Sequence, residues 1–101
     1  MKGTACISAL KALGDETRLR ILRLLFKEPL SVNEIAERLN VSQYNVSKHL
    51  RIMREAGLVE CERLGKERHY GIPVRLRAEL EASGGTLDLG CCTFRFDRLP
   101  K

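Results

Sequence analysis

The sequence predicts a mainly α-helical domain with one small β-hairpin, in the order of four helices, two strands, a fifth helix and a C-terminal tail. Three observations support this fold class. Apolar residues recur at helical spacing over most of residues 4–56, the spacing becomes that of extended strands over residues 58–72, and Gly, Pro, Ser or Asp stands at the changes. A chain of 101 residues forms one domain, and a domain this small gains stability by pairing with a second copy. We divide the chain into a main domain over residues 1–82, which contains the helices and the hairpin, and a Cys-containing tail over residues 83–101.

The first two helices are defined by helical periodicity and by the residues at their ends. Residues 4–13 place apolar side chains at helical spacing, and Gly14 ends this segment. Asp15 can accept hydrogen bonds from the free N–H groups of the next helix, over residues 16–26. That second helix is apolar over most of its circumference, so we expect it at the centre of the core, and Pro29 prevents it from continuing.

A short helix and a longer one follow, joined by a tight turn. Ser31 and Glu34 form a capping box, in which each side chain accepts from the other residue's backbone N–H, and the helix that this opens ends at Leu39. After the turn, Ser42 caps a helix that runs to about residue 56. The residues expected to face the core from this longer helix are Val46, Leu50 and Met53.

A β-hairpin, a fifth helix and a tail complete the chain. Residues 58–64 and 67–72 have the pattern of two strands around a Gly-Lys turn. A helix is expected over residues 74–82, and the Ser-Gly-Gly segment at 83–85 ends it. Residues 86–97 alternate loosely and are compatible with a strand, but the sequence does not identify a partner for that strand.

The order of these elements predicts a DNA-binding function. Two helices joined by a tight turn and followed directly by a basic hairpin, the wing, form a winged helix-turn-helix, in which the second helix enters the major groove. From Ser42 to Arg54 the chain carries basic residues and no acidic one. Amide side chains suit base edges, and cations suit phosphates. The side chains expected to contact DNA are Ser42, Gln43, Tyr44, Asn45, Ser47, Lys48, His49, Arg51, Arg63, Lys66, Arg68 and His69.

The amino-acid composition is consistent with DNA binding and indicates in which cellular compartment the protein is expected. The 18 Lys and Arg residues exceed the 13 Asp and Glu residues, which gives a net charge of +5 and favours a polyanionic partner. The N-terminal residues contain no apolar run of the kind that a signal peptide has. No apolar run in the chain approaches the roughly 18 residues of a membrane helix. We therefore expect a cytoplasmic protein without a membrane partner. In that reducing compartment the four cysteines, Cys6, Cys61, Cys91 and Cys92, are expected to be thiols.

Several motifs resemble those of the ArsR/SmtB family of winged helix-turn-helix metalloregulatory repressors. They are Gly-Asp-Glu-Thr-Arg-Leu-Arg-Ile-Leu at 14–22, Val-Ser-Gln-Tyr-Asn-Val-Ser-Lys-His-Leu at 41–50 and Ala-Gly-Leu-Val at 56–59. The resemblance runs from about residue 7 to residue 72, with Met53 and Lys66 as mild departures where Leu and Arg are usual. It implies a homodimer joined through its first and last helices. The dimer would bind an inverted-repeat operator in double-stranded DNA and leave it when an inducer binds.

The cysteines suggest which inducer such a repressor would sense. The family's Cys-Val-Cys motif before the recognition helix is absent, and the last helix has no His or Asp for a zinc, cobalt or nickel site. Cys91 and Cys92 are adjacent soft ligands that match As(III), Sb(III), Cd(II) or Hg(II). As(III) binds three thiolates, and Cys6 is the preferred third, because the resemblance implies that the first helix and the C-terminal region meet. Cys61 is expected to pack inward beside Val59. No obligatory cofactor is expected.

Other interpretations remain open at this stage. Cys6 and one of the C-terminal pair could form a reversible disulfide or polysulfide link in a redox- or sulfide-responsive repressor, or all four cysteines could be small apolar residues without a ligand. A winged helix could also serve protein contacts alone, although the acid-free recognition segment favours DNA. An enzyme is not expected, because no paired carboxylates or phosphate-binding Gly loop appear, and both histidines belong to the predicted DNA contacts.

Overall fold

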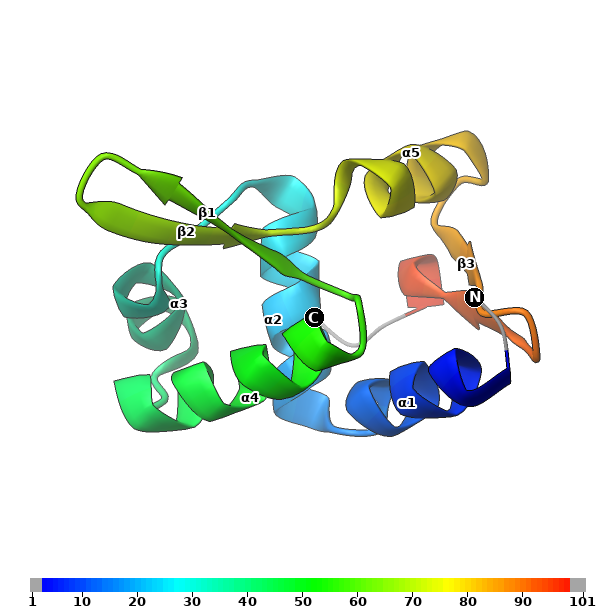
Figure 1. The fold of residues 1–101 in the computed structure, drawn as a ribbon, viewed down its shortest axis with the longest axis horizontal. Coiled ribbons are helices and arrows are strands. Elements are labelled where there is room, and N and C mark those ends of the chain that lie inside the picture. Colours follow the sequence, from blue (N-terminus) through cyan, green and yellow to red (C-terminus); the bar gives the residue numbers. More distant parts are fainter. Residues whose placement is uncertain (1–2, 99–101) are drawn as a thin grey trace.

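A computed structural model describes residues 3–98, so the outermost residues of the predicted domain and tail, 1–2 and 99–101, lie outside the described chain. Within that range, five α-helices and two antiparallel hairpins surround one core (Figure 1). The elements are α1 (Gly3–Leu13), α2 (Glu16–Lys27), α3 (Val32–Leu39), α4 (Gln43–Glu55), β1 (Glu60–Leu64), β2 (Glu67–Gly71), α5 (Val74–Ala82), β3 (Thr86–Asp88), β4 (Thr93–Arg95) and the 3-10 turn η1 (Phe96–Arg98). The predicted order of four helices, a hairpin, a helix and a tail is confirmed. None of the described helices is long and apolar enough to span a membrane.

Polar side chains cap the N-termini of α2, α3 and α4, the three helices for which the sequence predicts a capping residue. The Asp15 carboxylate accepts from the Arg18 backbone N–H at 3.0 Å and begins α2. The Ser31 hydroxyl accepts from the Glu34 N–H at 3.2 Å while the Glu34 carboxylate accepts from the Ser31 N–H at 3.1 Å, which confirms the capping box of α3. The Ser42 hydroxyl accepts from the Asn45 N–H at 3.1 Å and begins α4. Local chemistry therefore fixes where these helices begin.

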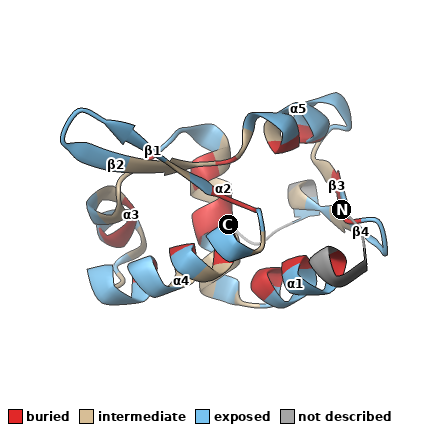
Figure 2. Cartoon of the chain, in the orientation of Figure 1, coloured by how far each residue is buried: buried red, intermediate tan, exposed pale blue. Residues whose placement is uncertain are grey.

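Helix α2 lies at the centre of the helical body, as its apolar sequence predicts. Ile21, Leu22 and Leu25 are fully buried, and α1, α3, α4 and β2 all pack against this helix (Figure 2). The buried residues of α4 are Val46, Leu50 and Met53, as predicted. Burial of this face leaves the opposite side of α4 in solvent, where it is available to a partner.

Helix α1 buries one face and exposes apolar side chains on the other. Cys6, Ala9 and Leu13 face the core, whereas Ile7 and Leu10 are 54% and 42% exposed. An isolated chain thus shows apolar side chains on the outer side of its first helix. Such an apolar face is suited to burial against a second subunit.

The wing is a short ribbon held at its base by the body. Strands β1 and β2 pair from Glu60 opposite Gly71 to Leu64 opposite Glu67 (Figure 1). The first strand begins two residues later than predicted, because Leu58 and Val59 are buried and the Leu58 N–H donates to the Met53 carbonyl at 2.9 Å. These contacts hold residues 58 and 59 in the core rather than in the ribbon.

The tail forms a second hairpin that belongs to the core. Strand β3 pairs with β4, which supplies the partner that the sequence did not identify. Leu87 and Leu89 are fully buried, and the Phe96 N–H donates to the Gly85 carbonyl at 2.7 Å. Figure 1 shows β3 between α5 and α1, so the end of the described chain lies beside its beginning.

Candidate nucleic-acid interface and thiol cluster

The exposed side of α4 has the composition that DNA contact requires. Among the predicted DNA contacts, six on this segment are exposed to solvent: Ser42, Gln43, Tyr44, Asn45, Ser47 and Lys48. Arg51 is exposed one turn further on, and the Tyr44 ring is 77% exposed despite its apolar area. The Gln43 side-chain amide donates to the Asn33 side-chain oxygen, which ties the first turn of α4 to the first turn of α3. An exposed aromatic ring and amides beside cations can contact bases and phosphates together.

A shallow hollow on this side of α4 is suited to an anion. Tyr44, Ser47, Lys48 and Arg51 line a cavity of about 300 Å³. Two cations and two hydroxyl groups can all interact with a phosphate, and the first turn of the helix carries no acidic residue that would repel one. The hollow therefore matches a DNA backbone phosphate in charge and in donors.

His49 is placed differently from the other predicted contacts on α4. Its ring is half-buried, and its Nδ1 lies 3.3 Å from Nη1 of Arg18 on α2. Burial lowers the pKa of His49 below its ordinary value of 6.5. The Asp15 carboxylate opposes this shift, whereas Arg18 and Lys48 add to it. The ring is therefore neutral at neutral pH, and one of its two nitrogens faces the protein.

The wing has two faces of opposite charge. Arg63 pairs directly with Arg68, so these two cations share one face of the ribbon near its tip. His69 pairs with Glu62 on the other face, and its Nε2 lies 3.1 Å from a Glu67 carboxylate oxygen. The structure thus groups the two arginines and separates His69 from them. Lys66 is exposed in the turn between the strands.

Helix α4 and the wing project from the same end of the molecule. In Figure 1 the N-terminal end of α4 and the tip of the wing both lie at the left of the view, with α3 between them. This arrangement lets one duplex contact α4 through its groove and the wing through its backbone.

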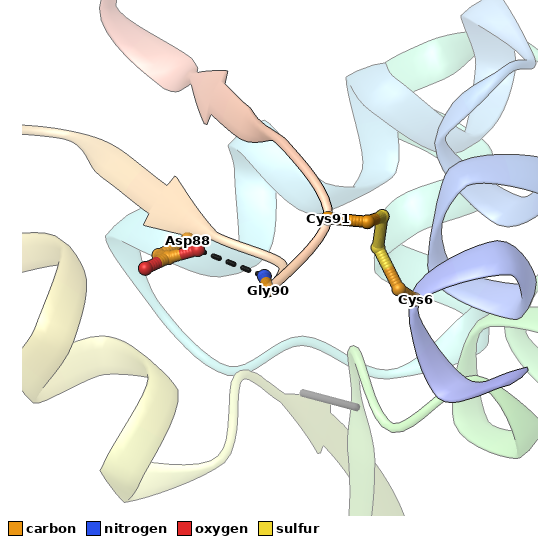
Figure 3. Close-up of a disulfide and its surroundings, with 4 residues drawn as sticks. All are labelled: Cys6, Asp88, Gly90 and Cys91. Carbon is orange, nitrogen blue, oxygen red and sulfur yellow. Dashed lines mark hydrogen bonds between the residues drawn. A yellow bond between two sulfur atoms is a disulfide. The ribbon is translucent and has the colours of Figure 1, made fainter. Parts of the chain in front are cut away.

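At the opposite end of the molecule, three cysteine sulfurs come together. Cys6 of α1 and Cys91 are joined by a disulfide with a Cα–Cα distance of 6.2 Å (Figure 3). The sulfurs of Cys6, Cys91 and Cys92 all lie within 4.8 Å of one another, and we call this group the thiol cluster. Cys6 is buried, and Cys92 is an exposed free thiol.

The expectation of four free thiols is therefore wrong for Cys6 and Cys91 and holds for Cys61 and Cys92. The physical reason is the turn between β3 and β4, which places Cys91 beside α1 although 85 residues separate it from Cys6. The Gly90 N–H donates to the Asp88 carboxylate at 2.8 Å, and Gly90 adopts a φ of 90°, which favours glycine (Figure 3).

Cys61 takes no part in the thiol cluster. It is half-buried on the wing opposite Tyr70, with which it shares a hydrogen bond. Burial, together with this thiol, raises the pKa of Tyr70 above its ordinary value. Cys61 therefore fits a packing role at the base of the wing.

Two residues at the interface were missed by the sequence analysis. Arg18 contacts His49, and Asn33 contacts Gln43, so both touch predicted DNA-contacting residues from neighbouring helices. Arg18 lies inside the Gly-Asp-Glu-Thr-Arg motif at 14–18, and this motif could have indicated that the residue matters. The motif alone does not show which helix the side chain reaches.

Comparisons with known proteins agree with this geometry. A family model described as a helix-turn-helix domain matches residues 13–62. The probable mercury resistance operon repressor of Streptomyces lividans is 30% identical over 89 residues, which cover 82% of this chain and 71% of that protein. The arsenical resistance operon repressor of Escherichia coli is 38% identical over 73 residues, which cover 71% and 62%.

A solved structure of a winged helix-turn-helix domain is also similar to this chain. The homodimeric winged helix-turn-helix DNA-binding domain Mb0332 from Mycobacterium bovis, described as a possible ArsR-family transcriptional regulator, superposes with a TM-score of 0.69 at 29% identity. The superposition covers 80% of this chain and 79% of that one. The matched proteins are described as regulators of transcription and not as enzymes. This agrees with the prediction that the chain is not an enzyme.

Proposed function

Because the chain belongs to the ArsR/SmtB family of winged helix-turn-helix transcriptional regulators, we propose that it is a homodimeric repressor whose inducer is a thiophilic metalloid. As(III) is the leading inducer, and Cys6, Cys91 and Cys92 are its ligands. The repressor binds an inverted-repeat operator, and loading of the thiol cluster releases it. The observation that carries the DNA-binding part is the exposed, acid-free segment 42–54 at the same end of the molecule as the wing with its two arginines.

The dimer follows from the family and from the exposed apolar side of α1. A single winged helix buries little of the operator, whereas two copies contact two half-sites about one helical turn apart. Mb0332 is homodimeric, and Ile7 and Leu10 supply apolar area for such an interface in this chain. Since the thiol cluster includes α1, a ligand there can tilt the two copies and change the spacing of their recognition helices.

The chemistry of the donor set supports the proposed inducer. As(III) binds three thiolates in a pyramid, and the three sulfurs of the thiol cluster lie close enough to be drawn onto one ion. Thiolates must be free to bind, so the Cys6–Cys91 disulfide has to be reduced first, which consumes two electrons and two protons. Sb(III) and Cd(II) are alternative inducers for the same ligands. The matched regulators of mercury and arsenical resistance support an inducer of this class.

The test is release of the reduced protein from a duplex that it has selected from a random-sequence pool. Fluorescence anisotropy of the labelled duplex is followed during titration with arsenite, cadmium, zinc or polysulfide. We expect arsenite to release the duplex, and we expect Cys6→Ser, Cys91→Ser and Cys92→Ser each to abolish this release. Cys61→Ser is the matched control and should respond as the unchanged protein does. Release by zinc alone, or arsenite release that survives all three cluster substitutions, contradicts the assignment. Failure to select any duplex contradicts DNA binding and would favour a module for protein contacts.

A second candidate, a redox- or sulfide-responsive repressor, is favoured by one observation, the Cys6–Cys91 bond. In this reaction two thiols lose two protons and two electrons to an oxidant such as peroxide or polysulfide, and one sulfur–sulfur bond forms. The two candidates are separated by measuring operator affinity for the reduced and the oxidised protein without metal. A large difference between these forms, together with no effect of arsenite, would establish the redox response instead.

A further inference from the structure

Arg18 connects three helices through one planar group. Its Nε donates to the Ala12 carbonyl at 2.6 Å, and its Nη2 donates to the Lys11 carbonyl at 3.2 Å. Both carbonyls belong to the last turn of α1, where a helix leaves its C=O groups without intrahelical partners. Arg18, near the start of α2, therefore caps α1. Its third contact, from Nη1, goes to His49 on α4.

The contact with Arg18 determines which nitrogen of His49 carries a proton. A guanidinium donates hydrogen bonds and accepts none, so the His49 Nδ1 must be the acceptor across the 3.3 Å separation. In a neutral imidazole the proton then resides on Nε2. The charged and titratable groups that face this ring are Asp15, Arg18 and Lys48, and their net effect together with burial keeps its pKa below the ordinary value.

The opposite edge of the ring is the one available to DNA. With Nδ1 directed at α2, Nε2 lies across the ring from Arg18, and the half-buried ring still reaches the surface next to the exposed Lys48. An Nε2–H on that edge has the chemistry to donate to an acceptor on a duplex. The Nδ1–H tautomer would present a lone pair there instead and would repel a phosphate oxygen.

On the basis of the DNA-binding function proposed above, we infer that Arg18 is a positioning residue that holds His49 as an Nε2–H donor to DNA and transmits displacements of α1 to α4. The rigid fork of the guanidinium makes its three contacts interdependent. Cys6 of the thiol cluster and the two carbonyls that Arg18 binds lie on the same helix, about 8–9 Å apart along its axis at 1.5 Å per residue. A change at the thiol cluster that moves α1 therefore also moves the group that orients His49.

The first test needs no DNA. Long-range ¹H–¹⁵N NMR of the imidazole nitrogens reports the tautomer of His49 at neutral pH. We expect the Nε2–H tautomer in the unchanged protein and a mixture of tautomers in Arg18→Gln. The matched control is Arg20→Gln, because Arg20 lies on the same helix but pairs with Glu16 on its exposed side at 2.9 Å. An Nδ1–H tautomer, or no change in Arg18→Gln, overturns the inference. Reduction of the Cys6–Cys91 bond should shift the His49 signals, and their constancy overturns the transmission through α1.

The second test uses substitutions of His49 to distinguish the role of Nε2 from that of Nδ1. Gln places an amide donor near the position of Nε2, whereas Asn reaches only the position of Nδ1. We expect His49→Gln to bind the selected duplex within about threefold of the unchanged protein, and His49→Asn to bind about tenfold more weakly, as for loss of one charge-assisted hydrogen bond. Arg18→Gln should lose about tenfold alone but under threefold in the His49→Gln background, because the donor no longer depends on Arg18.

Thermal unfolding of each variant excludes misfolding, and Arg18→Lys provides a second, charge-preserving variant if Arg18→Gln does not fold. Equal affinities of the two His49 variants, or an Arg18→Gln loss that persists with Gln at position 49, overturn the inference. If the unchanged protein binds no duplex, the proposed function fails, whereas the NMR result still decides the tautomer.

Discussion

Lys48 shows what one exposed side chain contributes when the partner is a polyanion. It lies in the hollow beside Arg51 on the outer side of α4, where each phosphate contact releases counterions. We expect Lys48→Ala to weaken binding to all duplexes to a similar extent. The slope of log affinity against log salt concentration should fall by roughly 0.9. Lys27→Ala, which removes the same charge at the far end of α2, should leave the slope unchanged. A slope that Lys48→Ala does not alter would show that DNA binds elsewhere.

His49 gives the fold a pH dependence of definite sign. Its pKa in the folded protein is lowered, first by burial, whereas in the unfolded chain it titrates near 6.5. As the pH falls below 6.5, the unfolded chain takes up a proton that the folded protein does not, so the free energy of unfolding decreases. Urea unfolding at pH 7.5 and 5.5 measures this decrease. The loss should be smaller in His49→Gln, and an equal loss in the two proteins contradicts this origin.

At the level of helices, the Ser42 hydroxyl caps α4 and also lies at the predicted DNA interface. Ser42 begins α4 by accepting from the Asn45 N–H, and it lies at the surface expected to meet DNA. Asp caps a helix about as well as Ser, so Ser42→Asp should change the free energy of unfolding by less than about 0.5 kcal/mol. The new carboxylate should nevertheless repel phosphates and weaken duplex binding by tenfold or more. Ser42→Asn is the uncharged control and should retain most of the affinity. Unchanged binding by Ser42→Asp would place the start of α4 away from the duplex.

The elements differ in how far the sequence predicts them. The capped starts of α2, α3 and α4 are predicted correctly, because each capping side chain and the backbone N–H that donates to it lie three residues apart. The start of β1 is not, because packing of Leu58 and Val59 into the core decides it. The wing was predicted as a basic hairpin with a two-residue turn, and such a turn fixes the pairing register. The structure shows this register, which puts Arg63 and Arg68 on one face and His69 on the other.

For the molecule as a whole, the tail is part of the core that supports the thiol cluster. Leu89 is fully buried next to the turn that carries Cys91, so Leu89→Ala should lower the free energy of unfolding by about 2–5 kcal/mol. Leu64→Ala is the matched control, because Leu64 is 49% exposed on the wing, and its effect should stay within about 0.5 kcal/mol. Both values come from urea denaturation. Equal effects of the two substitutions would show that the tail does not contribute to the core.

Local patterns in the chain were sufficient to establish the helices, their caps, the hairpin and the acid-free segment 42–54, because each depends on residues a few positions apart. The same patterns could not show that Cys91 bonds to Cys6, that β3 pairs with β4, or that Arg18 reaches His49. These contacts join segments up to 85 residues apart in the chain, and many packings of the same helices would satisfy the local rules. Their formation depends on how α1, α2 and the tail bury one shared apolar surface, which is a property of the whole fold.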